Sequence, residues 1–284
     1  MTPELAVRPR GPYSLRLSAR LASDATRTFR DGVFTTLVDG ETVRAWQSPD
    51  GTVTIRGGRA GAERMRWLLA LDDDHSDFLR AVRRDRLLAR AALELQGLRP
   101  VRVGSVAQSL LRALCGQLIE AKRARMLERK LVRAATPRGA EGLHPAPTCA
   151  DLASFSAPQL RSLGLHARRA AALLRICRSL DLERLHAVPT TKVAERLERE
   201  RCLGPWSVGI VCLEGLGRFD YGLVGDLGLV KLLGAMRGRY VEGRETAELL
   251  EPYGRWRGLA SVYMLAGFAR GLVPLEPGAS AAAA

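Results

Sequence analysis

The sequence predicts an α+β fold, in which a small N-terminal antiparallel β-sheet domain is followed by an all-helical part. Short β-rich runs with Asp-Gly turns occupy the start of the chain, and helical periodicity dominates from Asp72 onward. The length of 284 residues and the hydrophobic fraction of 46% suffice for a full core. We expect a β-rich domain at 1–71, helical domains at 72–275 and a disordered tail at 276–284.

The first domain is predicted from alternating apolar and polar residues. The expected strands are 13–18, 32–38, 42–47 and 52–56, with turns at Asp39-Gly40 and Asp50-Gly51. Residues 1–11 are rich in Pro and Arg, so we expect them to be loose, and 65–71 predicts a short helix. We interpret the sheet as a scaffold, because no charged cluster in it suggests catalysis.

The second part is almost entirely helical. The run Asp72-Asp73-Asp74-His75 is interpreted as a solvated turn before a helix at Phe78, rather than as a metal site. The further expected helices are 80–95, 106–118, 121–135, 158–163, 166–180, 191–199, 205–213, 227–236, 245–253 and 257–270.

Composition limits the function. The chain has 44 Lys and Arg against 30 Asp and Glu, a formal net charge of +14. These basic residues are dispersed among apolar ones, which favours a folded domain with a surface for a polyanion. An Arg-rich composition that merely reflects a GC-rich genome is the alternative.

Metal clusters and membrane insertion are not supported. The five cysteines form no CxxC pair and no Cys/His cluster, so we expect neither zinc nor an iron–sulfur cluster. No secretory signal and no long apolar span occur, so we expect a cytoplasmic, nucleoid-associated protein without membrane contact.

One stretch, 194–231, organises the helical part. Its turn at 201–205 leads into a helix at Pro205, a residue that suits a first helical position, and Gly204 tolerates positive φ. Free amides at such a helix start bind phosphate. Asp226 precedes the next helix as an N-cap, where the dipole favours an ionised carboxylate. Each piece alone is also compatible with an ordinary turn or cap.

The combination resembles the helix-hairpin-helix DNA glycosylases. Their hairpin consensus is Leu-Pro-Gly-Val/Ile-Gly, two variable positions and Thr/Ser-Ala, followed by an essential Asp. Residues 201–208 (RCLGPWSV) lie on that hairpin and Asp226 lies on the essential Asp. Cys202 and Val208 depart from the consensus Gly and Ala, and Cys202 puts in doubt how closely the turn can approach a phosphate.

Within the superfamily the 3-methyladenine DNA glycosylase II family is the nearest resemblance. It is carried by Trp206 and by the turn Gly116-Gln117-Leu118-Ile119, and it extends from about Leu69 to Leu272. In that family, too, a small sheet domain precedes the helical glycosylase core.

The resemblance implies a monofunctional DNA glycosylase of base excision repair. It would flip a damaged nucleotide out of double-stranded DNA and hydrolyse its N-glycosidic bond, with Asp226 stabilising the sugar cation. No second carboxylate is placed as a general acid, which suits an alkylated, already cationic purine. A lyase needs Lys where Trp206 stands, and Lys231 is expected to face DNA or solvent, so no strand cleavage is expected.

The resemblance also assigns binding residues. The DNA-binding residues are Gln117, Leu118, Cys202, Gly204 and Ser207; Leu118 would be a wedge in the base stack, or simply a core residue. The base-pocket residues are Trp206, Ile210 and Tyr263, and Trp206 is equally compatible with core packing. The carbonyls of Glu198, Glu200 and Leu203 are candidate ligands of a monovalent cation (Na⁺ or K⁺). No cofactor is required, and a monomer is expected.

Two other functions remain open. A catalytically altered DNA-binding module would keep the hairpin and lose the chemistry. A glycosylase for a deaminated or oxidised base would keep both, with a pocket that has fewer aromatic residues.

Overall fold

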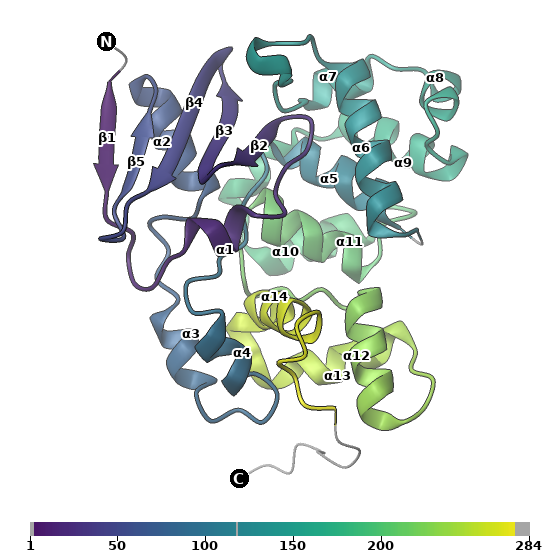
Figure 1. Cartoon of the computed structure of the whole chain (residues 1–284). Helices are drawn as coiled ribbons and strands as arrows, with labels where there is room; N and C mark the ends of the chain where they lie inside the picture. The colour runs from purple at the N-terminus through teal and green to yellow at the C-terminus, as the bar shows by residue number, and fades with distance from the viewer. Residues whose placement is uncertain (1–2, 118, 276–284) are drawn as a thin grey trace.

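Three hydrophobic cores organise the part of the chain that the structure describes. The structure is a computed structural model that describes residues 3–117 and 119–275. One core lies under the N-terminal sheet, one in a central helical lobe, and one in a second lobe built from α3 (Ser76–Ala81), α4 (Ala89–Glu94) and the last helices. Figure 1 shows the sheet and the central lobe side by side, with the second lobe below them.

The N-terminal domain is an antiparallel sheet, as the alternating pattern predicted. Its strands follow the order β1-β5-β4-β3-β2. They are β1 (Glu4–Val7), β2 (Arg27–Arg30), β3 (Val33–Val38), β4 (Glu41–Gln47) and β5 (Val53–Arg56). The β3–β4 turn has positive φ at Asp39 (49°) and Gly40 (81°), which is the backbone of a tight hairpin. Helix α2 (Arg59–Leu68) covers one face of the sheet, with Met65 and Leu68 buried.

Two expectations for this domain were wrong. Residues 13–18, expected as a strand, contain helix α1 (Leu15–Ala19), because Ser14 caps it and the Leu15 amide donates to the Gln47 side chain at 2.8 Å. Residues 1–11, expected to be loose, contain β1, which pairs with β5 along Glu4–Val7. The contact of Leu15 with Gln47 and the pairing of β1 with β5 join residues distant in the sequence, which local periodicity does not contain.

The central lobe surrounds the second core. It comprises α5 (Val106–Gly116), α6 (Ala121–Ala135), α7 (Cys149–Ala153), α8 (Ala157–Ser162), α9 (Ala167–Ser179), α10 (Thr190–Glu198) and α11 (Pro205–Ile210). Helix α11 continues without a break into a π-helical segment, η3 (Val211–Gly215), which periodicity did not predict. Short 3₁₀ segments occur at Ala140–Gly142 and Leu182–Ala187.

The second lobe joins segments far apart in the chain. It comprises α3 (Ser76–Ala81), α4 (Ala89–Glu94), α12 (Leu227–Arg237), α13 (Thr246–Leu250) and α14 (Arg257–Phe268), with 3₁₀ segments at Gly243–Glu245 and Glu251–Trp256. The single helix expected over 80–95 is divided, because the Asp85 carboxylate accepts hydrogen bonds from the amides of Leu87 and Leu88 and starts a new helical turn.

Candidate active-site cleft

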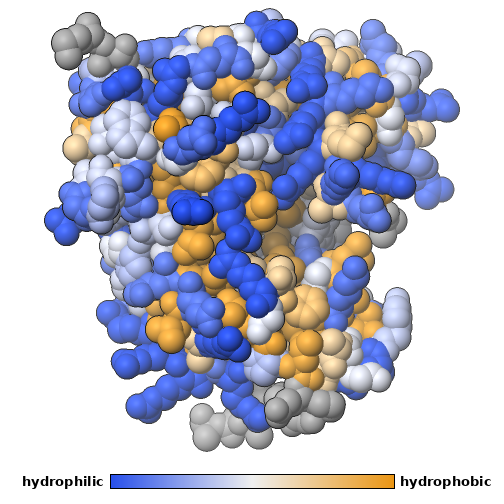
Figure 2. All heavy atoms as spheres, in the orientation of Figure 1, coloured by the Kyte–Doolittle hydropathy of each residue, from blue (hydrophilic) through white to orange (hydrophobic). Residues whose placement is uncertain are grey.

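A cleft of about 1930 Å³ separates the two lobes. It is lined by the loop before β2, the end of α5, the start of α6, the 202–207 turn, the start of α12 and the end of α14. Figure 2 shows apolar residues gathered around a hollow at the centre of this face. An apolar cleft with a few polar groups is the usual form of a ligand site.

Asp226 lies in this cleft as the N-cap of α12. One carboxylate oxygen, Oδ1, accepts a hydrogen bond from the Gly228 amide at 2.8 Å. The other, Oδ2, accepts one from the indole N–H of Trp206 at 2.8 Å. These two hydrogen bonds fix the orientation of the carboxylate. The side chain is only half-buried, so one face of it remains open to the cleft.

Trp206 connects the carboxylate to helix α5. Its ring lies directly on Gly116, where an added Cβ would approach the ring atom Cη2 to 2.6 Å. Trp206 lines the cleft and also packs against the core of the second lobe, a position compatible with both interpretations made from the sequence. Ile210, one turn further along α11, lines the same wall.

Tyr263 does not belong to this pocket, and that expectation was wrong. Its side chain is fully buried in the second lobe, and its hydroxyl donates to the carbonyls of Leu95 and Leu98, each at 3.2 Å. The cleft-lining residues of α14 are Val262, Leu265 and Ala266 instead. Helix α14 therefore directs Tyr263, which the resemblance placed in the base pocket, into the core of the second lobe.

The predicted hairpin is present between α10 and α11. The positive φ in its turn falls at Cys202 (76°), whereas Gly204 has an ordinary φ of −101°. Cys202 is exposed, and its Sγ lies 3.7 Å from the carbonyl oxygen of Arg168. Gly204 is exposed, and a Cβ added there would have no neighbour within 4 Å, so the surface at this residue is unobstructed.

Gln117 ties the end of α5 to the hairpin. Its side-chain amide donates to the Cys202 carbonyl at 2.6 Å and to the Ser207 hydroxyl at 2.9 Å. Ser207 is itself buried at 2% exposure, so its hydroxyl serves this tether. The proposed wedge, Leu118, lies outside the described residues.

The hairpin carbonyls are partly engaged in the turn itself. The Glu200 carbonyl accepts a bond from the Leu203 amide at 3.0 Å, and the Glu198 carboxylate accepts one from the Tyr221 hydroxyl. Over residues 3–117 and 119–275, no group of three or more His, Cys, Asp or Glu side chains is arranged to hold a metal ion. That finding concerns side chains and does not bear on backbone carbonyls.

Basic residues border the cleft from several elements. Those that line it at the surface are Arg20, Arg125, Lys231, Arg244 and Arg270. Helix α6 also carries Lys122, Arg123 and Arg133, which are exposed but do not line the cleft. This distribution favours a polyanion that runs along the mouth of the cleft.

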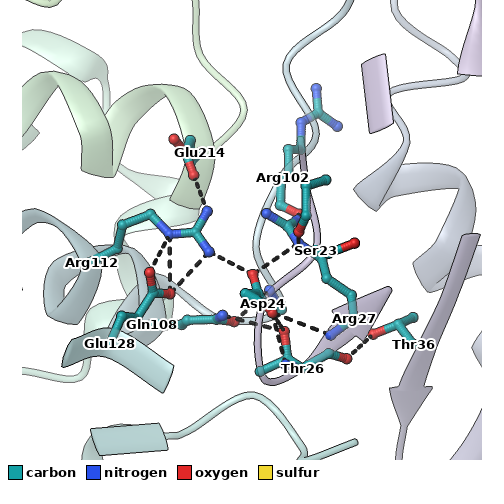
Figure 3. A network of polar contacts seen from close by, with 12 residues as sticks. Ser23, Asp24, Thr26, Arg27, Thr36, Arg102, Gln108, Arg112, Glu128 and Glu214 are labelled. Carbon is teal, nitrogen blue, oxygen red and sulfur yellow. Dashed lines mark hydrogen bonds and ion pairs between the residues drawn. The ribbon is translucent and has the colours of Figure 1, made fainter. Parts of the chain in front are cut away.

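A buried ion cluster, which the sequence did not predict, forms one end of the cleft. We call Asp24, Arg27, Arg112, Glu128 and Glu214 the Arg112 cluster; all five line the cleft. Figure 3 shows the Arg112 guanidinium between Glu214 on one side and Glu128 and Asp24 on the other. Its Nε lies 3.0 and 3.1 Å from the two Glu128 oxygens, and its Nη2 lies 2.6 Å from Asp24.

The charges of the cluster perturb one another. Burial opposes the charge of Arg112, yet Glu128, Glu214 and Asp24 together raise its pKa well above the ordinary value. Burial raises the pKa of Glu128 despite the contact with Arg112. For Asp24, burial is outweighed by Arg27 and Arg112, which hold its pKa below the ordinary value.

This cluster also corrects the interpretation of the sheet domain as a scaffold. Asp24 and Arg27 precede and begin β2, and Arg27 Nε donates to Asp24 at 3.1 Å within the cleft wall. The N-terminal domain therefore supplies charged groups to the candidate site. No local motif marks them, because their partners lie on α5, α6 and η3.

Comparisons with known proteins identify the fold. No protein-family model and no curated protein matches the sequence. A 3-methyladenine DNA glycosylase from Archaeoglobus fulgidus has a TM-score of 0.81 at 18% identity, covering 94% of this chain and 98% of that chain. An 8-oxoguanine glycosylase/lyase from Clostridium acetobutylicum, in its apo-form, has a TM-score of 0.76 at 16% identity, covering 93% and 96%.

The same Clostridium enzyme, in complex with double-stranded DNA containing cytosine opposite 8-oxoguanine, has a TM-score of 0.74 at 16% identity, covering 96% and 99%. The chain thus has the fold of the helix-hairpin-helix DNA glycosylases, as the hairpin motif predicted. None of the helices in the described ranges is long and apolar enough to cross a membrane.

Proposed function

We propose that this protein is a DNA glycosylase that removes damaged bases, with Asp226 as its catalytic carboxylate. The observation that carries the proposal is the position of Asp226: an acidic side chain held by two hydrogen bonds, at a helix start, in the cleft of a glycosylase fold. An N-glycosidic bond is inaccessible inside the base stack, so the nucleotide must enter the cleft extruded.

The chemistry assigned to Asp226 is electrostatic. As the base departs, positive charge develops on the deoxyribose, and a preorganised carboxylate stabilises that charge and orients the attacking water. The bonds from Gly228 and Trp206 hold the carboxylate before the substrate arrives. An alkylated purine is our proposed substrate, because it is cationic and leaves without a general acid.

We further propose that the enzyme is monofunctional. The family position of the lyase lysine holds Trp206, whose indole N–H is not a nucleophile. Lys231 is the lysine that lines the described part of the cleft, and it is exposed on α12. Borohydride trapping of a covalent DNA complex by the wild type, lost in Lys231→Ala, would overturn the monofunctional assignment.

DNA binding is assigned to the hairpin and the basic border of the cleft. The exposed, unobstructed position of Gly204 at a helix start and the basic residues of α6 support contacts to phosphates, which anchor the strand without reading sequence. The carbonyls of Glu198, Glu200 and Leu203 remain our candidate ligands for a monovalent cation there. Equal DNA affinity in K⁺ and in tetramethylammonium salts would rule out the proposed cation site.

A panel of duplexes tests the proposed function. Duplexes that carry a methylated purine, ethenoadenine, hypoxanthine, uracil or 8-oxoguanine are incubated with the protein, and abasic sites are then cleaved with alkali. We expect release of the methylated purine, lowered by at least about 10²-fold in Asp226→Asn. Asp220→Asn is the matched control, because Asp220 bonds Thr190 and does not line the cleft.

The outcomes of this panel separate the alternatives. Release of 8-oxoguanine or a deaminated base, with the same dependence on Asp226, would replace the substrate and keep the enzyme class. DNA binding without release of any base would favour the non-catalytic module.

A further inference from the structure

The Arg112 cluster has a charge composition that the proposed chemistry does not require. It places three carboxylates, Asp24, Glu128 and Glu214, around two guanidinium groups in one wall of the cleft. Side-chain exposure is 6% for Asp24 and 4% for Glu128, but 22% for Glu214. Glu214 is therefore the carboxylate of the cluster that is most exposed to the cleft.

The position of Glu214 follows from one continuous helix. Trp206, Ile210 and Glu214 are spaced four residues apart along α11 and η3, and all three line the cleft. This spacing places them on one side of the helix, over about 12 Å of axis. Trp206 bonds Asp226 at one end of this wall. We take a nucleotide whose sugar lies at Asp226 to extend its base along the wall toward Glu214.

Helix α5 leads to the same place. Gly116 lies against the Trp206 ring, and Arg112 is one turn earlier on the same helix. The Arg112 guanidinium donates to Glu214 Oε2 through Nη1. Both walls therefore run from the carboxylate of Asp226 to the pair formed by Arg112 and Glu214.

The π-helical segment explains why Glu214 can reach this position. Such segments are rare and occur frequently at functional sites. At Gly215 the backbone approaches α5 so closely that an added Cβ would lie 2.2 Å from the Ser109 hydroxyl. This contact holds η3 on α5 and brings Glu214 to Arg112. Arg112 occupies only Oε2; among the described residues Oε1 accepts no hydrogen bond.

A partly exposed carboxylate with a free oxygen offers a ligand two features, a hydrogen-bond acceptor and a negative charge. A base that offers N–H donors and carries a positive charge satisfies both features, whereas a neutral base satisfies only the first. Low dielectric in a largely apolar cleft strengthens this preference. Purines alkylated on a ring nitrogen are cations of this kind.

We infer that Glu214, oriented by Arg112, is the specificity-determining residue that selects a positively charged, N-alkylated purine at the end of the cleft. The inference rests on the proposed function, since it takes the sugar of the extruded nucleotide to lie at Asp226. Glu214 does not touch the reacting bond, so it acts on the choice of base and not on bond cleavage.

Binding to matched duplexes tests this role without catalysis. In an Asp226→Asn background, affinity is measured for a duplex with 7-methylguanine and for one with 7-methyl-7-deazaguanine, which has the same shape but no positive charge. The pH is kept low enough to leave the methylated base protonated at N1. We expect Glu214→Gln to lower affinity for the cationic base about tenfold, or about 1.4 kcal/mol, and to change affinity for the neutral base less than about twofold.

Two further variants define the controls. Glu120→Gln removes the same charge from an exposed carboxylate at the cleft border, and it should change both affinities equally. Glu214→Asp keeps the charge and should keep the preference for the cationic base. Equal losses on both duplexes in Glu214→Gln, or no loss, would overturn the inference. If the wild type released no base from any of the duplexes, the proposed function would be overturned instead. The binding assay does not depend on base release, so the two failures can be told apart.

Discussion

Replacing Trp206 by Phe tests whether the indole N–H positions Asp226, the proposed catalytic carboxylate. Phenylalanine keeps an aromatic ring over Gly116 and removes the donor that lies 2.8 Å from Asp226 Oδ2. A hydrogen bond to a charged group contributes about 1.5–3 kcal/mol. If that bond orients the carboxylate in the transition state, its loss slows base release by about 10- to 150-fold.

Single-turnover excision and equilibrium binding on the same duplex give the two quantities needed. We expect the excision rate to fall by that factor while DNA affinity changes less than about threefold, because the Gly228 amide still holds the other oxygen of Asp226. Trp46→Phe is the control. Trp46 lies on β4, with the Arg56 Cζ 5.2 Å from the centroid of its ring, and it does not line the cleft.

Two results would refute this reasoning. An unchanged excision rate in Trp206→Phe would show that the indole N–H does not position Asp226. Equal losses of rate and affinity would indicate that Trp206 acts through base stacking. Gly116→Ala provides an independent check, because its Cβ would displace the ring by approaching it to 2.6 Å while the N–H is retained.

Three other predictions follow from the hairpin and the second lobe. Cys202→Gly should raise stability by up to about 1 kcal/mol in thermal melts and strengthen DNA binding, because φ of 76° strains a residue with a Cβ; weaker binding would contradict this. Gly204→Ala should melt like the wild type, since its Cβ meets nothing within 4 Å, yet bind DNA more weakly at low salt. Unchanged affinity would remove the hairpin from DNA binding. Burial, with Arg99 and Arg102, lowers the pKa of His75 from 6.5 to about 3, so the unfolded chain alone takes up a proton below pH 6.5. The free energy of unfolding should therefore fall by about 2 kcal/mol between pH 7.5 and pH 5, because the 1.5 pH units below 6.5 contribute about 1.36 kcal/mol each. In urea titrations His75→Gln should lack that loss.

Local chemistry explains which parts of the fold were predictable. The hairpin of β3 and β4 follows from alternation and an Asp-Gly turn, both contained in a few adjacent residues. His75, expected in a solvated turn, is instead 2% exposed, with its ring 4.8 Å from that of Phe219. Its burial depends on a residue far along the chain, as do β1 and α1.

The candidate site shows the same division. The hairpin and the cap at Asp226 are local motifs, so their positions followed from the sequence, whereas the hydrogen bond from Trp206 joins residues 20 positions apart. The Arg112 cluster draws on three segments separated by up to 102 residues from Arg112, and no pattern in any one of them indicates an ion cluster. Tyr263 was misplaced because an aligned position does not specify which side of a helix faces the cleft.

The bonds of Gln117 have a consequence for how a strand would be gripped. The end of α5 and the hairpin meet through one side-chain amide before any ligand arrives. The conformational entropy of aligning these two turns is thus lost during folding rather than at the moment of association. If the protein binds DNA as proposed, a passing duplex would encounter a clamp that is already assembled.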